Sequence, residues 1–455
     1  MLAKWSIRAF AHEGDHLINK EKSRFFIRTF GCQMNVNDSE KVAGLLVAAG
    51  YEPAGDAAAA DFIFVNTCAV REKAADKLHH SLSRLKKLKA QRPGLRIGVG
   101  GCVAQLEGER ILEKARHVDL LVGTHTLHRV PELLQEAAGG PLVDLDRKAD
   151  AFSIPDAAVA HSSPVRAYVT VIEGCNHVCS FCVVPRTRGP EVNRPPDAIV
   201  REVAGLVDRG YPEVMLLGQT VNAYRFGDVD FATLLGRVNA VPGLRRLRFT
   251  TSHPEHVTPR LADALRDLDK VCPYLHLPVQ SGSDRVLASM RRGYDRRHYL
   301  ATVALLRDRV PDLSLTSDII VGYPGETDEE FEETVRLVQE VAFDGLFVFK
   351  YSPRPGTTAL RLGDDVPEEE KSRRLRVLND DQQRLQRSRN EARVGRREDV
   401  LVDAVAKEGV SGRTPHFRIV HLPGGGPELL GRVIDVEISG SGPNALIGRL
   451  TQTVH

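Results

Sequence analysis

The sequence lacks several features that would place it in a specialised class of protein. None of its 455 residues lie in an apolar run of 18 or more, so we expect no transmembrane helix. The first 22 residues lack the apolar core of a signal peptide. The formal net charge is only +2, which excludes a polycation and confines any nucleic-acid surface to a local patch. We therefore expect a soluble, cytoplasmic protein.

Cysteine is also scarce, and its distribution is uneven. Seven cysteines in a chain of this length are too few for a disulfide scaffold. The number is odd, and three of them lie between Cys175 and Cys182. This pattern favours metal ligation in a reducing compartment. Cys272 has no partner pattern and is expected to be a core thiol.

The hydrophobic pattern predicts an α/β protein of about three domains. We expect a disordered leader over residues 1–23, a first domain over 24–145 and a linker over 146–164. In the first domain, three apolar strands alternate with helical patterns, which indicates a doubly wound parallel sheet. The expected strands are Phe25–Phe30, Phe62–Val65 and Ile97–Gly100, and the expected helices are Asp38–Ala49 and Val70–Lys89.

Residues 165–393 repeat the strand–helix alternation six times, which predicts a partial (β/α) barrel. The expected strands are Ala167–Ile172, Glu213–Leu217, Arg246–Thr250, Tyr274–Pro278, Leu313–Val321 and Gly345–Phe349. A long charged helix over Pro367–Arg393 ends this domain. Residues 394–455 hold short strands separated by glycine-rich turns, which predicts a small β-barrel. Its expected strands are Asp399–Ala404, Phe417–His421, Gly431–Ser439 and Ala445–Leu450.

The clustered cysteines have the spacing Cys175-x-x-x-Cys179-x-x-Cys182 and follow the first barrel strand. Three thiolates on a tight loop can bind three corners of an iron–sulfur cluster and leave the fourth iron open for chemistry. The alternatives are three structural cysteines or a zinc site completed by His177. His177 lies inside the loop, too close in sequence to complete a tetrahedron comfortably, so the cluster is favoured.

This spacing resembles the signature of the radical S-adenosylmethionine (radical SAM) superfamily, including the aromatic Phe181 before the last cysteine. The resemblance implies that S-adenosylmethionine binds the open iron and is cleaved by one electron to a 5′-deoxyadenosyl radical, with the protein positioning the cofactor. Gln219 and Asn222 follow one barrel strand, and Asp318 lies in another; the resemblance implies that they bind the cofactor. An ordinary βα turn is the alternative for Gln219 and Asn222. His253 could contact a ligand or cap the next helix.

Three further cysteines are far apart in sequence, but each follows one strand of the first domain. They are Cys32, Cys68 and Cys102. Because the carboxyl ends of parallel strands meet at one edge of a sheet, three thiols there can converge on a single ligand. Buried structural cysteines at strand ends are the alternative.

The residues around these cysteines resemble the methylthiotransferases, and most closely the MiaB family of tRNA-2-methylthio-N6-dimethylallyladenosine synthases. The matching segments are Gly31–Asn35 and Asn66–Ala74. The resemblance implies that Cys32, Cys68 and Cys102 hold a second 4Fe–4S cluster, which handles the sulfur to be inserted. Arg186 and Asn193 depart from the family, which usually has tyrosine and often serine at these positions.

A basic helix before the terminal β module favours contact with RNA phosphates. Its arginines are Arg373, Arg374, Arg376, Arg384, Arg387, Arg389 and Arg393. The alternative is a solvated helix whose charges pair with nearby acidic residues. The module resembles the TRAM domain, an RNA-binding fold, at Gly412-Arg413-Thr414 and Phe417-Arg418.

The resemblance implies methylthiolation of N6-isopentenyladenosine at position 37 in the anticodon loop of tRNA. One S-adenosylmethionine would supply the methyl group and a second the radical. The implied partners are tRNA, an electron donor such as a flavodoxin or ferredoxin, and a sulfur donor of unidentified nature, with the chain a monomer. The alternatives are a sibling enzyme acting on a ribosomal protein or threonylcarbamoyl-adenosine, and a non-catalytic RNA-binding protein with structural metal.

Overall fold

The computed structural model describes residues 22–69, 72–136, 140–147, 152, 154–155 and 159–451. Nearly all of the expected leader and part of the expected linker lie outside these residues. The chain divides into two compact units. Unit 1 comprises residues 1–163, 173–176 and 183–192, and unit 2 comprises residues 164–172, 177–182 and 193–455. Among the described helices, none is long and apolar enough to cross a membrane.

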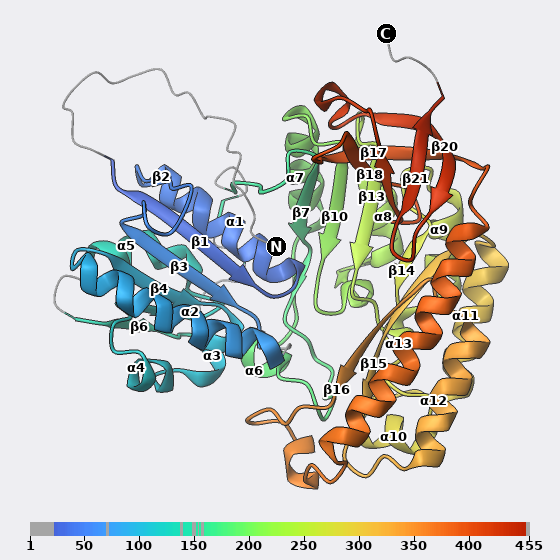
Figure 1. Cartoon of the computed structure of the whole chain (residues 1–455), viewed down its shortest axis with the longest axis horizontal. Coiled ribbons are helices and arrows are strands. Elements are labelled where there is room, and N and C mark those ends of the chain that lie inside the picture. Colours follow the sequence, from blue (N-terminus) through green and yellow to red (C-terminus); the bar gives the residue numbers. More distant parts are fainter. Residues whose placement is uncertain are drawn as a thin grey trace. The chain divides into compact units, whose positions relative to one another are not determined.

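Unit 1 is built on one parallel sheet of six strands in the order β2-β1-β3-β4-β5-β6 (Figure 1). The strands are β1 (Arg24–Phe30), β2 (Glu52–Pro53), β3 (Phe62–Thr67), β4 (Arg96–Gly100), β5 (Leu120–Val122) and β6 (Leu142–Asp144). The helices are α1 (Gln33–Ala48), α2 (Glu72–Gln91), α3 (Cys102–Glu107), α4 (Arg110–Lys114), α5 (Val130–Glu136) and α6 (Val184–Arg188).

Alternation along β3 explains why helices cover both faces of this sheet. Phe62 and Phe64 point into a core formed with α1 and α5. Ile63 and Val65 point into a second core formed with α2, α3 and α4. A strand that buries both faces needs a helical layer on each side. The doubly wound parallel sheet predicted from the sequence is therefore confirmed.

Unit 2 contains two parallel three-stranded sheets with the orders β13-β10-β7 and β14-β15-β16. Backbone hydrogen bonds from Leu247 to Lys270 and from Cys272 to Leu247 link the edge of β13 to the segment before β14. The six strands thus follow one another as a partial barrel, as predicted. They are β7 (Arg166–Thr170), β10 (Glu213–Leu217), β13 (Arg246–Thr250), β14 (Tyr274–His276), β15 (Ser314–Val321) and β16 (Gly345–Lys350).

Helices of unit 2 pack over the barrel strands and share one large apolar core with them (Figure 1). They are α7 (Pro196–Asp208), α8 (Phe231–Asn239), α9 (Pro259–Asp267), α10 (Asp284–Ser289), α11 (Arg296–Arg309), α12 (Asp328–Val341) and α13 (Glu368–Glu391). The short strands of this unit are β11 (Arg225–Phe226) and β12 (Val229–Asp230), while β8 (Ile172–Glu173) and β9 (Val192–Asn193) each have one residue in either unit. Thr327 and Glu330 form a capping box at the start of α12.

The chain ends in a closed barrel with the strand order β17-β18-β19-β21-β20. Its strands are β17 (Arg397–Val405), β18 (Val410–Arg413), β19 (Ile419–Leu422), β20 (Val433–Ser441) and β21 (Leu446–Leu450). The sequence pattern did not predict β18, which is only four residues long and contains a glycine. The predicted terminal β-barrel is confirmed.

Buried charges join this barrel to the central strands. Glu213 on β10 accepts hydrogen bonds from Arg166 and Arg248, and the Arg248 Nε–Glu213 Oε2 distance is 2.9 Å. Arg248 also donates to the carbonyl oxygens of Thr414 (2.8 Å) and Pro415 (2.7 Å). Its guanidinium carbon lies 4.8 Å from the centre of the Phe417 ring, within the range of a cation–π contact.

Replacing Glu213 with glutamine should destabilise unit 2, because it removes the buried carboxylate that Arg248 and Arg166 share. Breaking a buried ion pair from one side costs about 3–5 kcal/mol of unfolding free energy. Burial alone would raise the pKa of Glu213, but Arg248 and Arg166 lower it to about 2. The stabilisation is therefore complete above pH 4.5, the ordinary value, and is lost as pH falls toward 2.

Urea unfolding followed by circular dichroism at several pH values measures both effects. The matched control is Asp267→Asn, which breaks a fully exposed pair with Arg266 and should leave the unfolding midpoint unchanged. Equal midpoints for Glu213→Gln and the unsubstituted protein at pH 7 would contradict the role assigned to this carboxylate.

Candidate functional site

The dispersed cysteines lie together at the carboxyl edge of the unit 1 sheet. Cys32, Cys68 and Cys102 directly or nearly directly follow β1, β3 and β4, which are neighbours in the sheet. Cys32 is the N-cap of α1, and Cys102 is the first residue of α3. The side chains of Cys32 and Cys68 are hydrogen-bonded to each other. The edge predicted from the sequence therefore brings these cysteines into one cluster.

Two glycines keep the space around these thiols clear. Gly31 and Gly101 precede Cys32 and Cys102 and have φ angles of +154° and +90°. A Cβ atom at Gly31 would lie 2.6 Å from Cys68 Cβ, and one at Gly101 would lie 2.1 Å from Asn66 Oδ1. Any larger residue would therefore displace the neighbouring groups. Three thiols in such a cradle fit an iron–sulfur cluster, whose ligands are cysteine thiolates.

A buried arginine supplies positive charge to this cluster of thiols. Arg188, at the end of α6, is almost fully buried and pairs with Glu173 (2.9 Å) and Asp38. Burial opposes its charge, but Asp38, Cys102 and Glu173 raise its pKa well above the ordinary value. Arg188 also hydrogen-bonds Cys102. A permanent cation here stabilises thiolates and the negative charge of a thiolate-ligated cluster.

The electrostatic surroundings of the thiols differ. The hydrogen bond from Cys68 lowers the pKa of Cys32 to about 6 against the opposing effect of burial, with a further contribution from Arg188. Burial raises the pKa of Cys102, although Arg188 counteracts part of this effect. Cys32 is therefore the more acidic thiol of these two.

The clustered cysteines occupy the loop between β8 and α6. All three are partly buried and form no disulfide within the described part of the chain. The amide of Cys175 donates to the carbonyl oxygen of Gly189 (3.2 Å), and the amide of Cys182 donates to that of Cys179 (3.1 Å). Gly174 is required before the first cysteine because a Cβ there would lie 2.0 Å from the Pro190 carbonyl oxygen. A tight loop with three cysteines is the donor set that an open-cornered cluster requires.

Arg292 provides the cation beside Cys179. It is buried, and its Nη1 atom lies 3.4 Å from Cys179 Sγ. Burial would lower the pKa of Arg292, but Tyr294 and Cys179 raise it above the ordinary value. The guanidinium also donates to the Pro278 carbonyl oxygen (3.1 Å) and the Tyr294 hydroxyl (3.1 Å), which fixes its position.

The other residues singled out from the sequence lie in different settings. Phe181 packs on an apolar cluster that includes Met290 and Tyr323. Asn222 uses its amide to hold the backbone of His253, through contacts of 2.9 Å and 2.8 Å. Asp318 Oδ2 lies 3.4 Å from His276 Nε2 on the neighbouring strand.

Unpaired polar atoms mark the ends of β10 and β13. Within the described part of the chain, Gln219 Oε1 and Ser252 Oγ are buried and have no hydrogen-bond partner. Unpaired buried polar atoms are costly, and their presence at the carboxyl ends of barrel strands points to a polar ligand. They fit the hydroxyl and amino groups of a nucleoside such as S-adenosylmethionine. Gln219 was singled out from the sequence, whereas Ser252 was not.

The arginines expected to contact RNA in the terminal barrel are largely engaged within the protein. Arg413 pairs with Asp403, and Arg418 donates to Asp344 (2.5 Å). Phe417, with a φ angle of +66°, packs among arginine side chains. Several helix arginines are paired as well, and Arg374 is buried against Glu326. Arg376 and Arg387 of α13 are exposed.

Comparisons with known proteins agree with this geometry. Residues 169–338 match the radical SAM superfamily, and residues 24–123 match the uncharacterized protein family UPF0004. In structure, the chain resembles a radical S-adenosylmethionine methyltransferase, TsrM, from Kitasatospora setae, with a TM-score of 0.54, 13% identity and coverage of 74% of this chain and 77% of that one. It also resembles the cobalamin-dependent enzyme OxsB, with a TM-score of 0.52, 11% identity and coverage of 78% and 56%.

The fold and the cysteine loop therefore define a radical SAM enzyme. The chain is 45% identical over 447 residues to a tRNA-2-methylthio-N(6)-dimethylallyladenosine synthase of Neisseria gonorrhoeae, covering 94% of this chain and 99% of that one. It is 48% identical to the Acidovorax synthase, covering 91% and 95%. The chain belongs to this MiaB family of methylthiotransferases. Membership confirms the expected cofactors, S-adenosylmethionine and two 4Fe–4S clusters, and excludes a non-catalytic RNA-binding protein.

The depressed pKa of Cys32 should be visible in the cluster-free protein. Because only the thiolate reacts, alkylation of Cys32 by iodoacetamide should have its midpoint at about pH 6. Mass spectrometry of the digested protein after brief exposure at pH 5–9 measures it. Burial raises the pKa of Cys272, which should stay unmodified and serves as the control. A Cys32 midpoint near the ordinary thiol value of about 8.5 would contradict this picture.

Proposed function

We propose that this chain converts N6-isopentenyladenosine at position 37, in the anticodon loop of tRNA, to its 2-methylthio derivative. The observation that carries the proposal is the second group of cysteines on the edge of a parallel sheet, in addition to the cysteine loop of the radical SAM superfamily. Radical chemistry alone starts many reactions, whereas a second thiolate-bound cluster fits sulfur insertion. The relatives named as tRNA synthases support the substrate.

The two cysteine groups are assigned to separate clusters. Cys175, Cys179 and Cys182 hold the cluster that binds S-adenosylmethionine, and Cys32, Cys68 and Cys102 hold the auxiliary one. When bound, the first supplies the radical that activates C2 of the adenine ring, and the second handles the incoming sulfur. Neither group of cysteines offers a fourth thiol, because Cys272 is buried behind β13 beside Arg246 and Arg248. Each cluster therefore keeps a position for a non-protein ligand.

The protein's own residues bind and orient the reactants. Arg292 offsets the negative charge at Cys179, and Arg188 does the same at Cys102. Gln219 and Ser252 offer unpaired polar atoms to the nucleoside, while Asn222 holds the turn that carries His253. Phe181 anchors the cysteine loop on the apolar cluster beneath it. Asp318, on β15, is the remaining polar group assigned to the cofactor.

RNA phosphates are assigned to the exposed side of α13. Arg376 and Arg387 are 11 residues apart, which is about three helical turns, so they lie on the same face of the helix. Arg413 and Arg418 of the terminal barrel pair with acidic residues of the protein, so they are assigned to holding that barrel in place and not to binding RNA. Transfer of the electron falls to a cytoplasmic flavodoxin or ferredoxin, and the chain acts as a monomer.

Substituting one cysteine from each group should separate the two halves of the reaction. After anaerobic reconstitution, the unsubstituted chain should hold about eight iron atoms, and Cys179→Ala and Cys102→Ala about four each. Cys179→Ala should form no 5′-deoxyadenosine on reduction. Cys102→Ala should still form it but give no methylthiolated tRNA. Iron analysis and chromatography of the nucleosides measure these quantities.

Cys272→Ala is the matched control, because it removes a cysteine outside both groups. It should keep about eight iron atoms and full product formation. If Cys102→Ala folds normally but no longer cleaves S-adenosylmethionine, the assignment of the two cysteine groups to separate clusters is contradicted. One or two zinc ions in place of iron, with no cleavage, would sink the proposed function as a whole.

Loss of two exposed arginines on α13 should weaken tRNA binding without affecting sequence choice. Each phosphate contact that is removed lowers the slope of log affinity against log salt by about 1. Arg376→Gln with Arg387→Gln should thus reduce the slope by about 2. Fluorescence anisotropy with labelled tRNA between 50 and about 200 mM salt measures it. The control is Arg201→Gln, which replaces an exposed arginine on α7 and should leave tRNA binding unchanged. Equal salt slopes for the α13 double variant and this control would show that the RNA binds elsewhere.

A further inference from the structure

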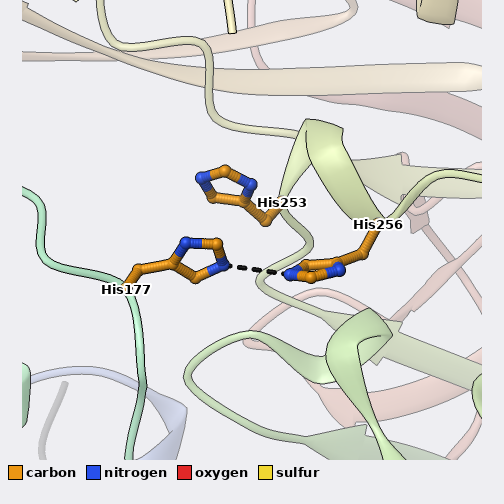
Figure 2. Close-up of side chains that lie close together, drawn as sticks. All are labelled: His177, His253 and His256. Carbon is orange, nitrogen blue, oxygen red and sulfur yellow. Dashed lines mark hydrogen bonds between the residues drawn. The ribbon is translucent and has the colours of Figure 1, made fainter. Parts of the chain in front are cut away.

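Three histidines of unit 2 converge beside the cysteine loop, outside the residues assigned above. His177 lies between Cys175 and Cys179. His253 precedes, and His256 ends, the 3-10 helix Pro254–His256 that follows β13. Figure 2 shows His177 and His256 facing each other, with the ring of His253 next to them. His177 Nε2 lies 3.0 Å from His256 Nε2, and the rings of His177 and His253 stack with centres 4.0 Å apart.

The three rings offer the donors of a transition-metal site. One nitrogen from each ring lies within 4.8 Å of the other two. Nitrogens bound to one tetrahedral zinc ion are about 3.3 Å apart, so side-chain shifts of about 1–2 Å would close the triad. In the absence of metal, the His177–His256 contact requires a hydrogen shared between two imidazoles, and a metal ion would take its place.

A carboxylate lies behind two of the rings. Glu255 Oε2 is 3.7 Å from His177 Nδ1 and 3.5 Å from His253 Nδ1. Metal-binding histidines commonly direct their second nitrogen toward a carboxylate, which sets the tautomer and leaves the other nitrogen for the metal.

His253 carries an independent sign of a missing ligand. Its Nε2 atom is buried and, within the described residues, makes no hydrogen bond. Burial, together with the Arg292 cation, lowers the pKa of this ring and favours its neutral form, and its Nδ1 atom accepts a long hydrogen bond (3.4 Å) from the Glu255 amide. The Asn222 amide fixes the His253 backbone from both sides, which keeps the ring in place. Buried polar atoms without a partner are uncommon in proteins, and a bound ion would satisfy this one.

We propose that His177, His253 and His256 bind one divalent transition-metal ion of the zinc class, separate from both cysteine groups. Imidazole donors favour zinc, copper, iron or nickel over magnesium or calcium. Three protein ligands leave a fourth position open for water or for Glu255. The bound ion would tie the loop between Cys175 and Cys179 to the turn after β13, and so fix the segment that carries the radical SAM cysteines.

The test uses the full chain with its cysteines occupied by reconstituted iron–sulfur clusters, so that thiolates do not compete for the probe, Zn²⁺. After desalting, the chain should retain about one zinc per chain, with unchanged iron. X-ray absorption at the zinc edge should show nitrogen or oxygen neighbours at about 2.0–2.1 Å and no sulfur at about 2.3 Å. His256→Ala should bind zinc at least tenfold more weakly by calorimetry, and so should His256→Gln, which tests the same loss with a polar side chain.

The matched control is His298→Ala, which removes a neighbouring histidine on α11 outside the triad. It should retain zinc like the unsubstituted chain, with the same circular dichroism spectrum as the His256 variants. The proposal is overturned if the unsubstituted holoprotein retains no zinc, if His256→Ala retains it equally well, or if the absorption spectrum shows sulfur ligands.

Discussion

The structure depends on one constraint: thiols must meet at the carboxyl ends of parallel strands. Cys32, Cys68 and Cys102 are brought together because β1, β3 and β4 are neighbours that run in the same direction. A shift of one strand by a single residue would displace the cysteine that follows it along this edge. Gly31 and Gly101 add a second requirement, since a side chain at either would fill the space between the loops.

Charge at both cysteine groups is balanced by arginines that the fold buries. Arg188 is held by Asp38 and Glu173, and Arg292 is held by Tyr294 and the Pro278 carbonyl oxygen. Burying a guanidinium is costly unless partners satisfy it. Here carboxylates, a hydroxyl and thiols satisfy the two buried guanidinium groups. Each group of thiolates therefore lies next to a fixed cation. The same requirement applies where the terminal barrel meets the central strands, because Glu213 and Phe417 satisfy the buried Arg248 there.

Much of the fold followed from local pattern. The strands Glu213–Leu217 and Arg246–Thr250 have the bounds expected from their apolar runs, because buried parallel strands are continuous in hydrophobicity. The short strands β2, β5, β6 and β18 were missed, since two to four residues carry too little periodicity. Helix α1 begins at Gln33 rather than Asp38, since the chain enters the helix directly after Cys32.

The parts of the candidate site that consist of cysteines at strand ends could be predicted from the sequence. The parts that depend on contacts between residues far apart in the sequence could not. The edge of three cysteines could be inferred from strand order alone. Arg188 could not, because its contact with Asp38 spans 150 residues. Arg413 and Arg418 were expected to face RNA, but their acidic partners lie on other elements and hold them inside the fold. His256 carried no signal until the turn after β13 placed it against His177.

The central claim is that this chain inserts a methylthio group into the isopentenylated adenosine of tRNA. Mass analysis of total tRNA nucleosides from cells that lack the gene tests it most directly. The account predicts loss of 2-methylthio-N6-isopentenyladenosine, accumulation of N6-isopentenyladenosine, and restoration by the intact gene but not by a copy encoding Cys102→Ala. An unchanged level of the methylthiolated nucleoside in the deletion strain would contradict it.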